Sequence, residues 1–185
     1  MLLSLIGYRG TGKSTVARIL AHRLGWEWTD ADVEIELLAG KSIKAIFEDD
    51  GEEAFRDLES AVAKELTQRN PLVLALGGGA VLREENRKLL RAAGPVVWLT
   101  ATPETLAARI AADTSTSERR PNLTSHGGIT EIIAMLDKRT PLYRDCASLV
   151  VDTENKTAAE VADEIIQSLN TPPDKPCGLD SGRTA

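Results

Sequence analysis

Short apolar runs alternate with longer segments of helical periodicity along this chain, and this alternation restricts the fold more than any other feature. The apolar runs lie at residues 2–6, 26–29, 72–76, 96–99 and 149–151, and helical patterns occupy 16–24, 55–66, 84–93, a segment that starts at Thr102-Pro103, 129–140 and 158–169. Strands that are apolar on both faces and are separated by helices are typical of a parallel sheet covered on both sides. The pattern predicts an α/β fold with three layers, α/β/α, around a central parallel sheet of about five strands. Ligands bind such sheets at the carboxyl ends of the strands.

The chain length of 185 residues fits one domain with a hydrophobic core, and we expect that domain to span residues 1–170. Residues 112–128 are polar and have no apolar periodicity. A segment of this kind in a compact domain is typical of a functional lid. Residues 171–185 are rich in Pro, Gly and charge, which favours a disordered C-terminal tail.

Charge and composition argue against several classes of partner. The net charge is −6 and aromatic residues make up only 4% of the chain, so a nucleic-acid-binding surface is not expected. The apolar run at 2–6 is too short to be a signal sequence or a membrane span. Cys146 and Cys177 match no metal-ligand spacing, and with His22 and His126 as the only histidines we expect no zinc site and two reduced thiols. We therefore expect a cytoplasmic protein, and a monomer.

The first apolar run is followed directly by a glycine-rich motif, Gly7 to Ser14 (GYRGTGKS), which fits G-x-x-x-x-G-K-[ST]. Such a loop turns its backbone N–H groups toward phosphate oxygens at a helix N-terminus. Lys13 can reach the β- and γ-phosphates, and the Ser14 hydroxyl can hold Mg²⁺. The motif predicts nucleotide binding by Gly10, Thr11, Gly12, Lys13, Ser14 and Thr15.

The motif alone does not separate a kinase from a GTPase or a motor. A guanine-reading motif would place an aspartate near residues 155–157, and Asn155-Lys156-Thr157 lacks it. A large motor ATPase does not fit into this chain length. The remaining class is a kinase for a small molecule or a nucleoside monophosphate.

Polar and glycine-rich residues follow two other predicted strands. Asp30 and Asp32 come directly after the second strand, where an Asp-x-Asp pair either caps the following helix or serves a ligand. Gly77 to Gly79 follow the third predicted strand, and three glycines suggest close approach of a ligand or another chain segment, the alternative being a flexible turn.

Two arginines lie on or beside apolar helix faces. Arg56 neighbours Phe55 and Leu58, and Arg139 lies three residues after Leu136. Each is either an arginine that extends along the surface to solvent or a buried charge that needs a partner. Two arginines that point into one pocket would form a fork for a carboxylate, and Glu59 is placed to orient Arg56.

Six segments together resemble the shikimate kinase family, over about residues 2–169. They are GYRGTGKST at 7–15, DADVEIE at 30–36, IFEDDGEEAFRDLE at 46–59, LGGGAV at 76–81, Arg120-Pro121, and KRTPLYR at 138–144. The resemblance implies a P-loop fold like that of the nucleoside monophosphate kinases. It also implies ATP and shikimate as substrates, and Mg²⁺ as the metal.

The resemblance also implies roles for individual residues. The acceptor site comprises Asp32, Arg56, Gly78, Gly79 and Arg139 within a substrate segment at about 31–60, with Phe47 and Phe55 as pocket walls. Ser14 and Asp30 hold the metal, and the catalytic residues are Lys13, Asp32 and Arg120. Arg109 packs on adenine and Lys156 lies near the nucleotide. Arg119, adjacent to Arg120, is an alternative for the arginine that reaches the phosphate.

Two departures and two alternatives accompany the resemblance. The lid is longer than is usual in the family, and Asn122 stands where an apolar residue is common. The alternatives are a gluconate-type sugar-acid kinase and a nucleotide-binding regulator without catalysis. Arg56, the glycine triplet and KRTPLYR argue against the first, and the presence of Lys13, Asp32 and Arg120 argues against the second.

Overall fold

The computed structural model describes residues 1–113 and 128–170. Its centre is a five-stranded parallel sheet of β1 (Leu2–Ile6), β2 (Glu27–Asp30), β3 (Leu72–Ala75), β4 (Val96–Thr100) and β5 (Leu149–Asp152). The strand order is β2-β3-β1-β4-β5. The predicted α/β class and the parallel sheet of about five strands are confirmed.

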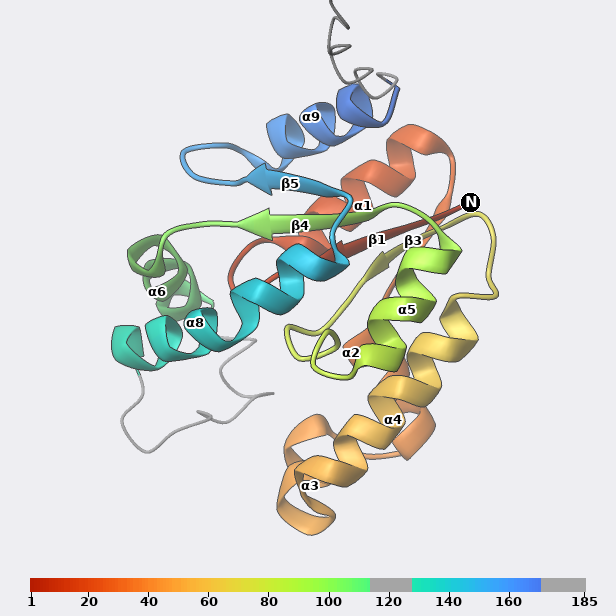
Figure 1. Cartoon of the computed structure of the whole chain (residues 1–185), viewed down its shortest axis with the longest axis vertical. Helices are drawn as coiled ribbons and strands as arrows, with labels where there is room; N and C mark the ends of the chain where they lie inside the picture. The colour runs from red at the N-terminus through yellow and green to blue at the C-terminus, as the bar shows by residue number, and fades with distance from the viewer. Residues whose placement is uncertain (114–127, 171–185) are drawn as a thin grey trace, which may run out of the picture.

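Eight helices complete the described fold (Figure 1). They are α1 (Lys13–Leu24), α2 (Ala31–Ala39), α3 (Ile43–Asp49), α4 (Gly51–Leu66), α5 (Glu84–Ala93), α6 (Pro103–Ala112), α8 (Gly128–Cys146) and α9 (Ala158–Asn170). Every helix among these residues is too short or too polar to cross a membrane.

Two hydrophobic clusters, one on each side of the sheet, form the core. On β1, Leu2 and Ile6 face a cluster that includes residues of α4, α5 and α8, whereas Leu3 and Leu5 face a cluster built with α1 and α9. Figure 1 shows α1 and α9 on one side of the sheet and α4, α5 and α8 on the other. Because both faces are covered, every residue of β1 and β3 is buried, as the continuous apolar runs predicted.

The second strand begins one residue later than predicted. The prediction placed it at 26–29, but the backbone N–H groups of Gly25 and Trp26 both donate to the carbonyl of Ala21. Gly25 takes the left-handed conformation, with φ +67°. Trp26 therefore belongs to the C-terminal cap of α1, and β2 starts at Glu27.

The short helices α2 and α3 carry no clear periodic signal in the sequence. Leu37 and Leu38 of α2 are 72% and 57% exposed, so the apolar residues of this segment do not mark one buried face. Asp30 and Ser42 cap the two helices by accepting from backbone N–H groups of the first turn. The caps, rather than an apolar stripe, identify these helices.

The helix predicted over 129–140 continues to Cys146, with Pro141 inside it. The expected lid at about 112–128 falls between the end of α6 and the start of α8, and residues 114–127 lie outside the described residues. The tail predicted at 171–185 also lies outside them.

Candidate active site

Three loops meet at the carboxyl edge of neighbouring strands. Because β2, β3 and β1 are adjacent, the segments that follow them line up at one edge: Asp30 to Asp32, Gly77 to Gly79, and Gly7 to Ser14. A pocket of about 560 Å³ lies there. The predicted site residues that line it are Gly10, Gly12, Lys13, Ser14, Thr15, Asp30, Asp32, Gly78 and Arg109.

The phosphate-binding loop has the conformation that its glycines permit. Gly12 is the N-terminal cap of α1, with φ +84°, which only glycine adopts without strain. A side chain at Gly7 would place its first carbon 2.4 Å from the carbonyl oxygen of Leu99, so the close packing of β1 against β4 requires glycine here. These two positions explain why the motif needs glycine rather than any small residue.

Polar side chains hold this loop from within. The Thr11 hydroxyl donates to the Tyr8 carbonyl at 2.9 Å, and Lys13 Nζ donates to the same carbonyl at 2.8 Å. Thr11 is buried and is not among the residues that line the pocket. Thr11 therefore shapes the loop, whereas Lys13 lies in the pocket where a phosphate would bind.

Asp30 caps a helix and also bonds to the phosphate-binding loop. One carboxylate oxygen, Oδ1, accepts from the Asp32 N–H at 3.0 Å and caps α2. The other, Oδ2, accepts a hydrogen bond from the Ser14 hydroxyl. Two oxygen ligands from different loops therefore adjoin at the pocket.

This oxygen pair fits Mg²⁺. In kinases, Mg²⁺ is usually held by one or two protein oxygens together with substrate phosphates and waters rather than by a complete protein cage. No group of three or more His, Cys, Asp or Glu side chains suited to a metal occurs in residues 1–113 and 128–170. Ser14 and Asp30 are thus the described residues that suit a phosphate-bound cation.

Arg56 is buried, paired and held against the glycine loop. It is 8% exposed, and its Nη1 donates to Glu59, itself 3% exposed, at 2.7 Å. Its Nη2 donates to Glu52 at 3.2 Å. A side-chain carbon built on Gly79 would lie 2.2 Å from Arg56 Nη1, so the guanidinium occupies the space beside this glycine. Burial with a carboxylate partner excludes the solvent-extended alternative for Arg56.

Arg139 lies on α8 and approaches Gly78, the glycine that precedes Gly79. It is also 8% exposed, and its guanidinium lies 5.9 Å from the centre of the Tyr8 ring. Its Nη1 is 3.5 Å from the place that a side-chain carbon on Gly78 would take. The two arginines thus adjoin consecutive glycines of the same loop.

An aromatic wall lies next to Arg56. The rings of Phe47 and Phe55 have centroids 4.7 Å apart, and the Arg56 guanidinium carbon is 5.0 Å from the centre of the Phe55 ring. Both phenylalanines pack with the core cluster below the pocket. Phe55 contacts the arginine directly, and neither phenylalanine is among the residues that line the 560 Å³ pocket, in which both were expected as walls.

Arg109 is fixed at the other end of the pocket. Its Nη1 donates to the Thr153 hydroxyl at 2.9 Å, and its Nη2 donates to the Thr153 carbonyl at 2.8 Å. Thr153 is 2% exposed and donates in turn to the Thr100 carbonyl. Thr153, a residue that sequence patterns did not indicate, therefore orients Arg109.

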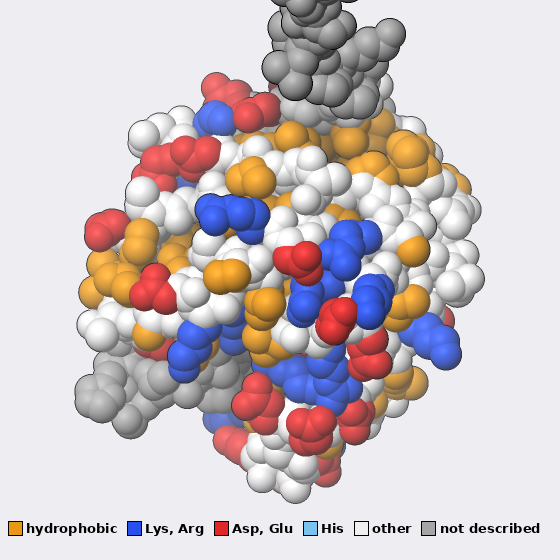
Figure 2. Space-filling model, viewed as in Figure 1, with side chains coloured by type: hydrophobic (Ala, Val, Ile, Leu, Met, Phe, Trp, Pro, Cys, Tyr) orange, Lys and Arg blue, Asp and Glu red, His pale blue; other side chains and the backbone are white. Residues whose placement is uncertain are grey.

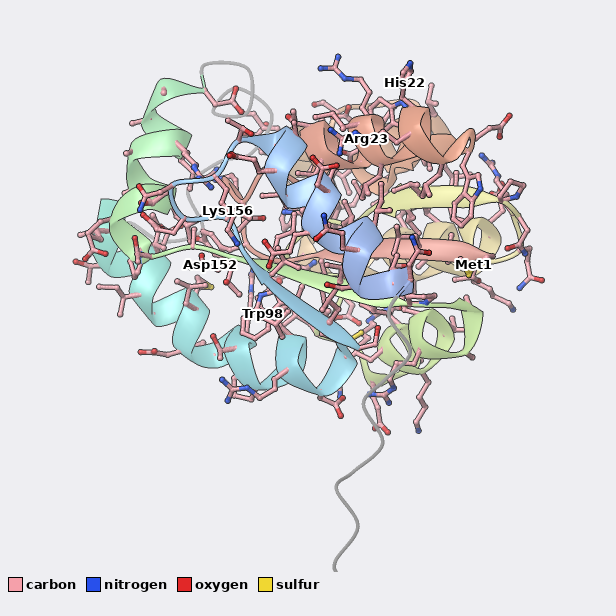
Figure 3. All side chains as sticks on the ribbon, turned by 90° about the horizontal axis from the view of Figure 1, so that it is seen from above. Met1, His22, Arg23, Trp98, Asp152 and Lys156 are labelled. Atoms are coloured by element: carbon pink, nitrogen blue, oxygen red, sulfur yellow. The ribbon has the colours of Figure 1, made fainter. Side chains whose placement is uncertain are left out.

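Lys156 is not brought into the pocket. Its Nζ pairs with Glu164 of α9 at 2.5 Å, and it does not line the pocket. Figure 3 shows Lys156 in the connection between β5 and α9, after Asp152 at the end of β5. Arg119 and Arg120 lie outside the described residues.

Sequence patterns did not indicate several of the residues that line the pocket. They are Arg9, Trp28, Val33, Glu36, Ile43, Leu76, Gly77 and Asp113. Arg9 lies inside the phosphate-loop motif, and Trp28 precedes Asp30 on β2, so their proximity to predicted site residues was a usable signal. Glu36 accepts from the Ile43 N–H at 3.0 Å and ties α2 to α3, a contact that no local pattern indicates.

Comparison with known proteins identifies the family of this chain. The family model for shikimate kinase matches residues 9–170. A curated shikimate kinase of Rhodopirellula baltica is 44% identical over 166 residues, which cover 90% of this chain and 89% of that protein. The solved shikimate kinase of Acinetobacter baumannii in complex with shikimate superposes with a TM-score of 0.85 at 39% identity, over 91% of this chain and 92% of the other.

A gluconokinase of Sinorhizobium meliloti has a TM-score of 0.56 at 16% identity, over 90% of each chain. A likeness at this level supports only a common fold. Because the family model spans most of the chain and the curated relative aligns over nine tenths of it, this chain belongs to the shikimate kinase family.

Proposed function

We propose that this chain transfers the γ-phosphoryl group of ATP to the 3-hydroxyl of shikimate, giving shikimate 3-phosphate and ADP for aromatic amino acid biosynthesis. ATP-dependent phosphorylation of shikimate is the activity of the family to which the chain belongs.

The nucleotide side comprises the phosphate-binding loop and Arg109. Backbone N–H groups at the start of α1 and the Lys13 ammonium face the phosphates, where negative charge is spread in the transition state. Mg²⁺ bound with ATP offsets phosphate charge, and Ser14 and Asp30 are the residues that would hold it. Two hydrogen bonds to Thr153 fix the orientation of the Arg109 guanidinium, which can then stack on the adenine ring.

The acceptor side is carried by one observation: two buried arginines adjoin consecutive glycines beside the phosphate pocket. This fork suits the carboxylate of shikimate, and Gly78 and Gly79 can donate their N–H groups to the same molecule. Asp32 lines the pocket at the start of α2, where it can hold a substrate hydroxyl and accept its proton. Since the transition state is loose, orientation contributes more than the basicity of Asp32.

The remaining assignments complete the proposal. Arg120, or its neighbour Arg119, closes over the transferring phosphoryl group from a lid at about 112–128 and excludes water. Lys156 would contact the nucleotide only if its ion pair with Glu164 opened. The domain at 1–170 acts as a monomer in the cytoplasm, with ATP and shikimate as its partners and without a nucleic-acid or membrane partner.

A coupled ADP-release assay with Mg²⁺ and ATP tests the function. We expect turnover with shikimate and none with gluconate. Lys13→Met should reduce kcat at least 100-fold, about the scale for loss of one group that stabilises transition-state charge. Lys88→Met is the matched control, because Lys88 is exposed on α5 and pairs with Glu84 along the same helix.

The outcomes separate the alternatives. Turnover with gluconate but not with shikimate would establish a sugar-acid kinase. Folded protein that binds nucleotide without turning over either acceptor would establish a regulator. A near-normal kcat for Lys13→Met would show that Lys13 does not stabilise the transferring phosphate.

A further inference from the structure

We propose that Tyr143 is a positioning residue of the acceptor site, and that its hydroxyl sets the direction in which the Gly78–Gly79 peptide presents its N–H group. The inference rests on the proposed function, because it concerns how that site is held in shape. Tyr143 belongs to the KRTPLYR segment, but no role for it follows from the sequence.

The contact that carries the proposal is a buried hydrogen bond between α8 and the glycine loop. Tyr143 is fully buried, and its hydroxyl donates to the Gly78 carbonyl at 2.6 Å. The ring stacks on Trp98 of β4, with centroids 5.6 Å apart and planes inclined by 25°. Figure 3 shows Trp98 between the sheet and α8. The stacked ring leaves the hydroxyl little freedom to point elsewhere.

The geometry of the peptide bond transmits this contact to the pocket. In a planar trans peptide, the C=O and the N–H point in opposite directions. The C=O of Gly78 and the N–H of Gly79 belong to one such unit, so a hydrogen bond that fixes the carbonyl toward Tyr143 turns the N–H away from it. Two glycines in sequence would otherwise let this peptide rotate with little steric resistance.

The same face of α8 carries Tyr143 and Arg139, one of the two arginines of the fork. Arg139 and Tyr143 are four residues apart in α8, so their side chains project from the same side of the helix. Both approach Gly78: a side-chain carbon built there would lie 3.3 Å from the Tyr143 hydroxyl and 3.5 Å from Arg139 Nη1. Any shift of α8 therefore moves the arginine and the glycine peptide together.

The other carbonyl groups of the glycine loop are also held by hydrogen bonds within the protein. All six carbonyl oxygens from Gly77 to Leu82 accept hydrogen bonds from the protein: Gly77 from Ala80 N–H, Gly78 from Tyr143, Gly79 from Leu82 N–H, Ala80 from Asn86 Nδ2, and Val81 and Leu82 from Arg87 Nη1.

The N–H groups of Gly77, Gly78 and Gly79 have no acceptor among residues 1–113 and 128–170. Because every acceptor of the loop is occupied within the protein, what remains for a ligand is a row of donors. Such a row selects hydroxyl and carboxylate oxygens over donor groups. Tyr143 supplies the one bond in this set that comes from α8.

A buried tyrosine could also act only by filling the core, so the test separates binding from stability. Tyr143→Phe keeps the ring and its stacking and removes only the hydroxyl. We expect the Kd and KM for shikimate to rise about tenfold, while the KM for ATP changes less than twofold. Ser148→Ala is the matched control, because Ser148 also loses a hydroxyl bonded to the backbone, at Val96, remote from the pocket.

Unchanged affinity for shikimate in Tyr143→Phe, with a melting temperature lowered as in Ser148→Ala, would overturn the inference in favour of a purely structural role. A wild-type protein that does not bind shikimate would instead refute the proposed function, and the inference with it.

A second measurement uses the wild-type chain and does not depend on how the variant folds. In ¹⁵N-labelled protein, shikimate should shift the Gly79 amide resonance strongly, and a non-hydrolysable ATP analogue alone should shift it much less. A Gly79 resonance that does not respond to shikimate would also overturn the inference.

Discussion

Under the proposed function, Arg56 and Arg139 are the charged side chains that would select a ligand carboxylate. Each is 8% exposed, and a charge that is so buried is costly unless it is paired. The hydrogen bond to Glu59 offsets the cost of burying Arg56 and fixes the direction of its guanidinium. Burial also strengthens the attraction of both arginines for a ligand carboxylate, since less water screens it.

At the residue scale, Gly79→Ala tests whether the loop must be glycine because of Arg56. The added carbon would lie 2.2 Å from Arg56 Nη1, and Glu59 prevents an easy retreat of the guanidinium. We expect the KM for shikimate to rise by about one to two orders of magnitude, the scale for a charged contact worth roughly 1.5–3 kcal/mol, with the KM for ATP nearly constant.

Gly78→Ala is the comparison for that substitution. Its new carbon would meet nothing nearer than 3.3 Å, so a shift of a few tenths of an ångström accommodates it. We expect a smaller effect on shikimate kinetics. If both variants lose shikimate affinity equally, close approach of Arg56 is not the reason for glycine at position 79.

At the element scale, the end of α8 is fastened to α5 by an ion cluster. The Asp145 carboxylate accepts from Arg87 at 2.9 Å and from Arg91 at 3.0 Å. Arg87 also donates to the carbonyls of Val81 and Leu82, so the cluster reaches the loop that continues from the glycines. Figure 2 shows basic and acidic side chains interleaved on the face that carries α4 and α5.

This cluster gives a prediction for pH dependence. Hydrogen bonds from Arg87 and then Arg91 hold the pKa of Asp145 below its usual value of 3.8. A lowered native pKa stabilises the fold above pH 3.8, and the contribution is lost as the pH falls through the native pKa. Asp145→Asn should therefore lower the free energy of unfolding modestly at pH 7, with a difference from wild type that shrinks toward pH 3.

Urea unfolding at pH 7, 5 and 3 measures this difference. Glu84→Gln is a useful control, because Glu84 forms an exposed pair with Lys88, four residues along the same helix. A difference between wild type and Asp145→Asn that is constant across this pH range would exclude the ion cluster as its source.

At the scale of the whole molecule, the strand order brings the site together. The order β2-β3-β1-β4-β5 places the phosphate-binding loop in the middle, with the acceptor loops after β2 and β3 on one side and the Arg109–Thr153 contact on the other. One pocket can then hold a nucleotide and an acceptor end to end. The arrangement depends on the intact core on both faces of the sheet.

The reactivity of the Cys146 thiol is a measure of whether that core is closed to solvent. It is 1% exposed, and burial raises the pKa of its thiol from 9.0 to about 11. A raised native pKa contributes stability that is complete below pH 9 and is lost as the pH rises from 9 to about 11. In a Cys177→Ser background, we expect slow alkylation of Cys146 by iodoacetamide at pH 9 in native protein and fast alkylation in urea.

The alkaline arm of this experiment compares the background with its Cys146→Ala derivative. Unfolding free energies at pH 8 and pH 10.5 should fall more for the background, because only it carries the buried thiol. Equal losses in the two proteins, or rapid native alkylation, would mean that Cys146 does not remain protonated in a closed core.

The sequence by itself determined the layered α/β class, the phosphate-binding loop and the position of two arginines on or beside apolar helix faces. These features are encoded locally, because apolar periodicity and glycine spacing depend on residues that are near one another in the chain. Arg56 and Glu59, three residues apart on α4, could be paired from spacing alone. The pocket position of Lys13, Ser14 and Asp32 followed from the loops at the strand ends.

Only the tertiary structure decided which residues hold those groups in place. Asp30 both caps α2 and bonds Ser14, Arg109 is fixed by Thr153, and Tyr143 reaches Gly78 across 65 positions. Such contacts depend on the order of the strands and the angles of the helices, which no local pattern specifies. The sequence thus determined what chemistry the edge of the sheet can perform, and the packing of distant segments decided the direction in which its donors point.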